Sequence, residues 1–100
     1  MKTFLIIYRP GPAWLGGLPV SRQPLQEHGQ YILGLYREGK LRFGGPFEDD
    51  AGGAVVVEVA DPHEARAIAD NDPAVMNGVF VYELHPWKLL PWQEYVNAGR

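Results

Sequence analysis

Two side chains far apart in this sequence are suited to proton transfer. His28 lies in a stretch whose apolar residues recur every three or four positions, and Asp72 stands directly before Pro73. A carboxylate beside an imidazole selects one tautomer and leaves the other ring nitrogen free to accept or donate a proton. Spacing alone favours a simpler interpretation, in which His28 is a buried histidine bonded to a backbone carbonyl and Asp72 is part of an Asp-Pro turn.

The elements predicted around these residues bring them to one end of the molecule. Branched and aromatic runs predict strands at 3–9, 41–47, 54–60 and 79–85. A first helix precedes Gly39, and a second begins at Asp61 and Pro62. The resulting order, βαββαβ, predicts an α+β ferredoxin-like fold with a four-stranded antiparallel sheet. Because the elements alternate in direction, the start of the first helix and the end of the second share one edge.

Two details of the helices are also predicted. Ser21 is a candidate N-cap for the first helix, although Pro24 favours a start one turn later. The apolar face of that helix is expected to contain Leu25, His28, Ile32, Leu35 and Tyr36.

The composition indicates one domain that needs no disulfide. With 100 residues, 46% of them hydrophobic, the chain can bury its own core. We expect a single domain over residues 1–100, with a core at 3–87 and a C-terminal tail at 88–100. The absence of cysteine excludes zinc fingers, iron–sulfur clusters and thiol catalysis.

Charge, hydropathy and histidine spacing indicate which binding partners the protein lacks. Nine basic and twelve acidic residues are mixed along the chain, for a net charge of −3, so we expect no nucleic-acid partner. The apolar run Phe4–Tyr8 is too short for a signal peptide or a membrane span, so we expect a cytoplasmic protein. His28, His63 and His85 lack close ligand spacing, and we predict no metal.

The strands predict a second copy of the chain as a partner. An antiparallel sheet with one face in water alternates apolar and polar residues, but the strands at 3–9, 54–60 and 79–85 are apolar on both sides. The predicted helices cover only one face. We therefore expect a homodimer paired through sheet faces, the alternative being an aromatic tail that folds back over its own sheet.

Other residues are candidates for substrate binding. Two arginines flank the loop that follows the first strand and suit an anionic group, and three aromatic residues suit a flat ring. These candidates are Arg9, Arg22, Trp14, Phe47 and Trp87.

Several segments together resemble the YciI-like, or YCII-related, family. They are His28–Ile32, Gly39–Leu41, Gly44–Phe47, the acidic turn at 48–53 and the segment 72–78, within a similarity over about residues 3–87. The resemblance implies a dimeric α/β barrel in which two ferredoxin-like sheets face each other. It also implies a His–Asp acid–base pair, which maps onto His28 and Asp72. Gly29 and the Pro/Gly loop at 9–19 depart from the family pattern.

The resemblance implies a reaction class. One relative eliminates chloride from a chlorinated hydroxyquinol-type ring, and related barrels include muconolactone isomerases. We therefore expect a cofactor-free lyase or isomerase, dehydrochlorinase- or lactone-isomerase-like, acting on a small cyclic or aromatic metabolite, with His28 as general acid/base and Asp72 as its orienting partner. Two alternatives stay open: a non-catalytic small-ligand-binding or sensing module, and a dimeric-barrel monooxygenase in which His28 contacts haem or oxygen.

Overall fold

The computed structural model describes residues 1–99 and contains one four-stranded antiparallel sheet. Its strands are β1 (Lys2–Pro10), β2 (Leu41–Pro46), β3 (Gly53–Val59) and β4 (Phe80–Pro86), in the order β2-β3-β1-β4. Each predicted strand is present, and no strand end differs from its prediction by more than one residue. The ferredoxin-like α+β fold is thereby confirmed.

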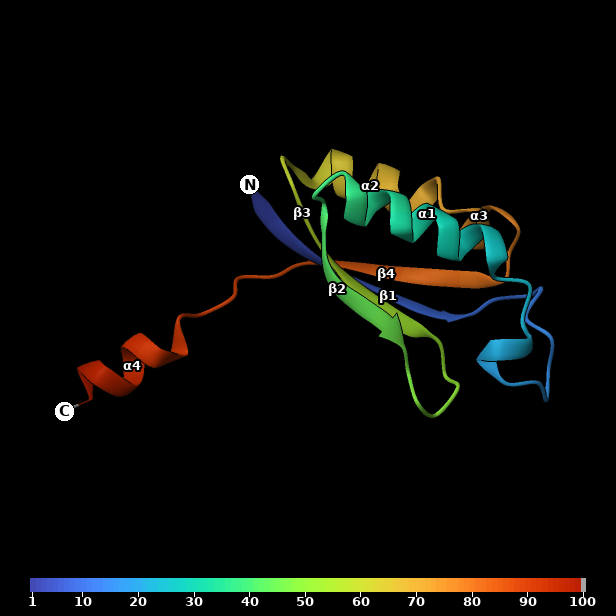
Figure 1. Cartoon of the computed structure of the whole chain (residues 1–100), viewed down its shortest axis with the longest axis horizontal. Coiled ribbons are helices and arrows are strands. Elements are labelled where there is room, and N and C mark those ends of the chain that lie inside the picture. The colour runs from blue at the N-terminus through green and yellow to red at the C-terminus, as the bar shows by residue number, and fades with distance from the viewer. Residues whose placement is uncertain (100) are drawn as a thin grey trace.

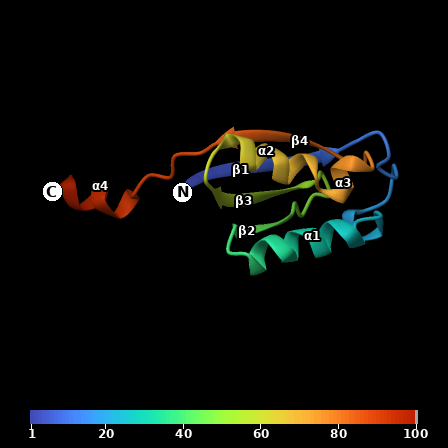
Figure 2. The same cartoon turned by 90° about the horizontal axis from the view of Figure 1, so that it is seen from above.

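Three helices lie on one face of the sheet, as Figures 1 and 2 show. They are α1 (Gln26–Arg37), α2 (Pro62–Asp70) and the short α3 (Pro73–Met76). Asp61 caps α2 as predicted, because its carboxylate accepts a hydrogen bond from the backbone N–H of Glu64 at 2.9 Å. Ser21 does not cap α1. It lies in a separate 3₁₀ turn, Val20–Arg22, and α1 begins after Pro24.

The core lies between the sheet and these helices. Alternate residues of β1, Phe4, Ile6 and Tyr8, are fully buried there beside the valines of β3. Leu35 of α1 joins this core, but Tyr36 is 61% exposed. The prediction that Tyr36 shares the buried face was wrong, because one residue further along a helix turns the side chain about 100° away.

The opposite face of the sheet has no helix over it. Leu5 and Ile7 of β1 are only half-buried on this side, and Phe43 of β2 and Val81 of β4 are exposed. The apolar side chains predicted on both faces of the strands are therefore present, and residues 1–99 do not cover one of these two sets.

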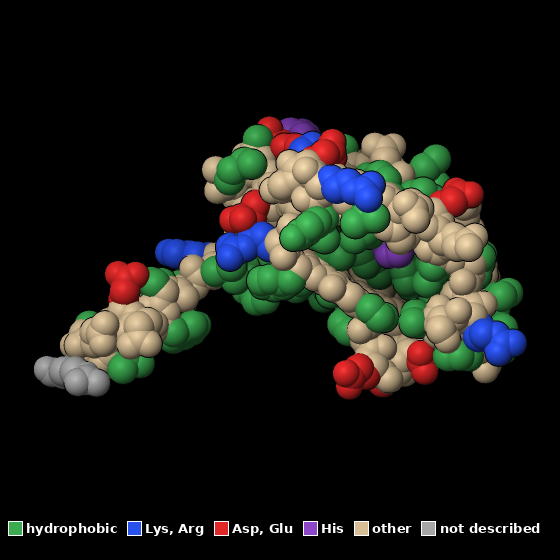
Figure 3. Space-filling view, viewed as in Figure 1, with side chains coloured by type: hydrophobic (Ala, Val, Ile, Leu, Met, Phe, Trp, Pro, Cys, Tyr) green, Lys and Arg blue, Asp and Glu red, His purple; other side chains and the backbone are tan. Residues whose placement is uncertain are grey.

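The C-terminal tail does not provide that cover. After β4 the chain runs away from the body and ends in α4 (Trp92–Ala98), which stands clear of the sheet in Figures 1 and 3. Trp92 and Tyr95 are exposed and contact each other, with ring centroids 5.6 Å apart. The alternative that the aromatic tail folds back over its own sheet is not what the structure shows.

Candidate functional site

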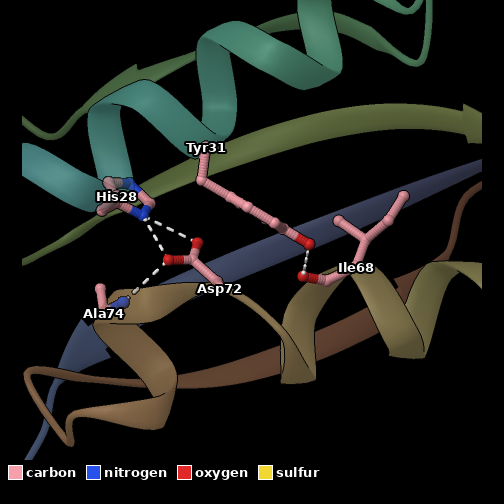
Figure 4. A network of polar contacts seen from close by, with 5 residues as sticks. All are labelled: His28, Tyr31, Ile68, Asp72 and Ala74. Atoms are coloured by element: carbon pink, nitrogen blue, oxygen red, sulfur yellow. Dashed lines mark hydrogen bonds and ion pairs between the residues drawn. The ribbon is translucent and has the colours of Figure 1, made fainter.

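His28 and Asp72 meet in a direct polar contact between α1 and α3. Nδ1 of His28 lies 2.7 Å from Oδ2 and 2.9 Å from Oδ1 of Asp72 (Figure 4). The Asp72 side chain is 0% exposed, whereas 17% of the His28 side chain is accessible. The predicted meeting of these two residues at one edge of the fold is thus present in the structure.

Local structure holds the carboxylate in place. Asp72 is the N-cap of α3, and its Oδ1 accepts a hydrogen bond from the backbone N–H of Ala74 at 2.9 Å. Pro73 occupies the first turn, where a missing N–H costs nothing. The sequence indicated a turn here, so the cap is an additional role of Asp72. Because the carboxylate is anchored by the backbone, it presents a fixed acceptor to His28.

This geometry assigns the protons of the imidazole. An ionised carboxylate can only accept hydrogen bonds, so Nδ1 of His28 carries the proton that faces Asp72. Within residues 1–99, Nε2 has no hydrogen-bond partner. In the neutral ring Nε2 is then an acceptor with a free lone pair, which is the form a general base requires.

Aromatic rings enclose the imidazole. The ring of Tyr8 lies edge-on to His28 with centroids 5.3 Å apart, and Phe80 does the same at 5.4 Å. The Tyr8 hydroxyl is buried and has no hydrogen-bond partner among the described residues. Burial, and next the negative charge of Asp72, raise the pKa of Tyr8. Tyr8 is therefore a neutral phenol at physiological pH.

Tyr8 and Phe80 were not predicted as site residues. Each lies in an apolar strand, where the sequence pattern indicates core and nothing more. The one signal available was position, because both stand at the strand ends that point toward the start of α1.

A pocket of about 280 Å³ opens beside His28, between α1 and the hairpin formed by β2 and β3. Figure 3 shows the corresponding apolar hollow beneath the helices. Its surface is mostly apolar, with His28 among its few polar groups, a composition typical of small-molecule sites. The pocket is lined by Tyr8, Val20, Leu25, His28, Gly29, Ile32, Gly44, Gly45, Pro46, Gly52, Gly53, Ala54, Val55 and Phe80.

Side-chain hydrogen bonds hold the loop that closes one end of this pocket. Gln23 is buried, and its amide bonds both the N–H and the carbonyl of Leu15 and the carbonyl of Leu18. Val20, which lines the pocket, donates its N–H to Asp50 on the β2–β3 turn at 3.0 Å. The long Pro/Gly loop is thus connected to the hairpin across the pocket, which sequence periodicity did not indicate.

The five residues predicted to bind substrate lie in different parts of the structure. Arg22 lines a second, polar cleft of about 560 Å³ that also borders His28. Trp14 packs on Phe80, with ring centroids 5.8 Å apart, and so lies one layer behind the apolar pocket. Phe47 stands at the β2–β3 turn, where its N–H donates to the carbonyl of Gly52.

Arg9 and Trp87 lie elsewhere. Arg9 forms an ion pair with Glu83 on β4, with Nε and Oε1 2.8 Å apart. Trp87 follows the end of β4, and its N–H donates to Thr3 at the start of β1. Because Phe80 at the other end of β4 is the residue that contacts His28, Trp87 is separated from the pocket by the length of a strand.

Residues 1–99 contain neither a metal-ligand cluster nor a membrane-spanning helix. No three metal-ligating side chains come together in this part of the chain. None of its helices has the length and apolar character to cross a membrane.

The chain is therefore a ferredoxin-like α+β protein in which His28 and Asp72 form a hydrogen-bonded pair beside an apolar pocket. A model of the YCII-related domain matches residues 1–88. The chain therefore belongs to the YCII-related family, as its sequence segments predicted.

The chain is similar to one protein by sequence and to another by structure. The uncharacterized protein YjpA of Bacillus subtilis (strain 168) is 37% identical over 69 residues, which cover 69% of this chain and 81% of YjpA. A solved structure of 5-chloro-2-hydroxyhydroquinone dehydrochlorinase, TftG, from Burkholderia phenoliruptrix AC1100, in complex with 2,5-dihydroxybenzoquinone, has a TM-score of 0.60 and 24% identity. That match covers 86% of this chain and 93% of the TftG chain, and it concerns the fold.

Proposed function

We propose that this protein is an acid–base enzyme that needs no cofactor and moves a proton on a small cyclic or aromatic, oxygenated metabolite. The observation that carries the proposal is the 2.7 Å contact of His28 with a fully buried Asp72 at the wall of an apolar pocket. A buried carboxylate needs a hydrogen-bonded partner, and a paired imidazole with a free nitrogen is the usual general base of such sites. In this proposal His28 is the catalytic residue and Asp72 its positioning residue.

The proposed step begins with neutral His28. In the keto form of the ring, its Nε2 takes a proton from the carbon next to the carbonyl, and the electron pair of the C–H bond moves toward the carbonyl oxygen to form an enolate. In an elimination this pair then expels a leaving group such as chloride from the neighbouring carbon, and a double bond forms. In an isomerisation the imidazolium returns the proton to a different atom. The name of the structural relative TftG, a dehydrochlorinase, supports the first of these outcomes.

We further propose that the protein works as a homodimer through the uncovered face of its sheet. Half-buried Leu5 and Ile7 and exposed Val81 lie on that face, and apolar patches of this kind are typical of interfaces. A two-fold pairing covers the same patch on both copies at once.

The catalytic proposal is tested with His28→Asn. The asparagine amide places an N–H donor where Nδ1 lies, so Asp72 keeps a partner, but the base is lost. With a panel of chlorinated hydroquinones and unsaturated lactones, the wild type should incorporate solvent deuterium into, or release chloride from, at least one compound. We expect His28→Asn to slow that reaction by about 10²–10⁴-fold.

The control is His63→Asn, because His63 is an exposed residue at the start of α2. It should react as fast as the wild type. Equal rates for His28→Asn and the wild type would refute the assignment of His28, whereas binding without turnover of any panel compound would instead favour a ligand-binding module.

A further inference from the structure

The pocket beside His28 has one wall that is poor in side chains and a second wall, on α1, that contains a glycine. The β2–β3 hairpin contributes Gly44, Gly45, Gly52 and Gly53, so this wall is largely backbone. Most of these glycines are required where they stand. A Cβ at Gly44 or Gly53 would lie 2.7 Å from a backbone oxygen, and Gly52 has a φ of 118°.

Gly29 on the opposite wall has no such requirement. Its backbone φ is not positive, and a Cβ built there meets no atom within 4 Å. It lies in α1 four residues after Leu25 and three before Ile32, on the helical stripe that lines the pocket. Glycine inside a helix is less stable than alanine. The helix therefore keeps a destabilising residue at an exposed position on the wall of the pocket.

The size of the pocket and the free nitrogen of His28 indicate which ligands this space can hold. A cavity of roughly 150 Å³ is enough for one benzene ring, and this pocket is about 280 Å³. His28 lines the same pocket with 17% of its side chain accessible, and its Nε2 has no hydrogen-bond partner among residues 1–99. In the neutral imidazole with its proton on Nδ1, Nε2 accepts hydrogen bonds, so a ligand that carries a ring hydroxyl can donate to it.

We infer that Gly29 is a specificity-determining residue, whose missing side chain widens the pocket so that it accepts a planar oxygenated ring with a fused second ring or a bulky substituent. The inference rests on the proposed function, because it concerns the substrate of the same pocket. Gly29 then determines how large a substrate the pocket can hold.

The test compares Gly29 with Gly34, which lies in the same helix, also has open space around its Cβ and does not line the pocket. Ligand binding is measured by NMR titration with hydroquinone, a single ring, and 1,4-dihydroxynaphthalene, a fused pair. Gly29→Leu should weaken binding of the naphthalene about tenfold or more and that of hydroquinone much less. Gly34→Leu should leave both affinities at their wild-type values.

Stability supplies a measurement that needs no ligand. Gly29→Ala and Gly34→Ala should each raise the folding equilibrium constant about fivefold, because alanine is the better helix former. A loss of stability in Gly29→Ala alone would overturn the inference, since the helix would then require this glycine.

Three other results separate the inference from the proposed function. Equal binding of the naphthalene to wild type and Gly29→Leu would overturn the inference and leave the acid–base site intact. A Gly29→Leu protein with a changed oligomeric state would also overturn it, because the space would then belong to a second copy. Failure of both rings to perturb the wild-type resonances around His28 would overturn the ring substrate in both proposals.

Discussion

Asp72 has two partners that make different demands on its side chain. It accepts a hydrogen bond from the N–H of Ala74 as the cap of α3, and it accepts the Nδ1 proton of His28. The first role needs only an oxygen, and asparagine caps helices as well as aspartate does. The second role needs an acceptor without protons, because an amide can also donate. A substitution that keeps the cap can therefore isolate the effect on the imidazole.

We predict that Asp72→Asn folds but loses activity. The amide oxygen can still accept from Ala74, whereas its NH₂ group can donate to Nδ1 and favour the tautomer with the proton on Nε2. Turnover should fall by about 10²–10⁴-fold, as expected when a general base is held in the wrong tautomer. Thermal unfolding followed by circular dichroism checks the fold, and deuterium incorporation checks the activity. Wild-type turnover in this variant would show that Asp72 only caps α3.

Asp72→Ala provides the comparison. It removes the cap as well as the partner of His28, and loss of a cap alone costs about 1 kcal/mol. This variant should therefore be less stable than Asp72→Asn.

At the scale of elements, the side chain of Glu64 makes contacts that stabilise the start of α2, the helix that precedes Asp72. The Glu64 carboxylate accepts a hydrogen bond from the N–H of Ala60 at 3.0 Å, and its other oxygen lies 3.1 Å from Nζ of Lys40. The Ala60 N–H first, and then Lys40, lower the pKa of Glu64 below its ordinary value of 4.5. Folding therefore favours the ionised carboxylate. This stabilisation is present above pH 4.5 and is lost as the pH falls through the lowered pKa of the folded state.

We predict that Glu64→Gln lowers the melting temperature at pH 7 and that the difference from wild type disappears in acid, once the pH is below the lowered pKa of the native carboxyl. Because Glu64 is exposed at the surface, the effect at pH 7 should be small. Melting curves of both proteins across this pH range are the measurement. Glu48→Gln, in the exposed β2–β3 turn, serves as the control. A difference in melting temperature that grows as the pH falls would contradict a stabilising role of the ionised Glu64 carboxylate.

At the scale of the whole molecule, the helices and the sheet leave one apolar surface uncovered. The helices bury Phe4, Ile6 and Tyr8, but the alternate residues Leu5 and Ile7 face the side without helices. Burial of apolar area is favourable by about 25 cal/mol per Å², so pairing of two such faces stabilises both copies. The tail cannot supply this burial, because it extends away from the body.

We predict that the wild type sediments with twice the chain mass of 11.2 kDa. Val81→Glu should dissociate it, because Val81 lies on the uncovered face and a two-fold axis would bring two buried charges into the interface. Leu33→Glu, an equal change at an exposed position of α1, should leave the mass unchanged. Sedimentation equilibrium measures all three proteins. A monomeric wild type at micromolar concentration would refute the dimer.

The sequence by itself determined the order of the four strands and of α1 and α2, and it placed His28 and Asp72 at one shared edge. Strand and helix patterns are local, and the alternating direction of the elements follows from their order, so the shared edge needed no coordinates. The apolar residues on both sides of the strands were readable for the same reason, because side chains alternate along any strand.

Only the tertiary structure decided what surrounds the pair. It showed that Tyr8 and Phe80 pack against His28. It also showed that Arg9 forms an ion pair with Glu83 and that Gly29 lines a pocket. These relations depend on strand register and on the rotation of α1 about its axis. Both are set by packing between segments far apart in the chain, and a one-dimensional pattern does not encode them.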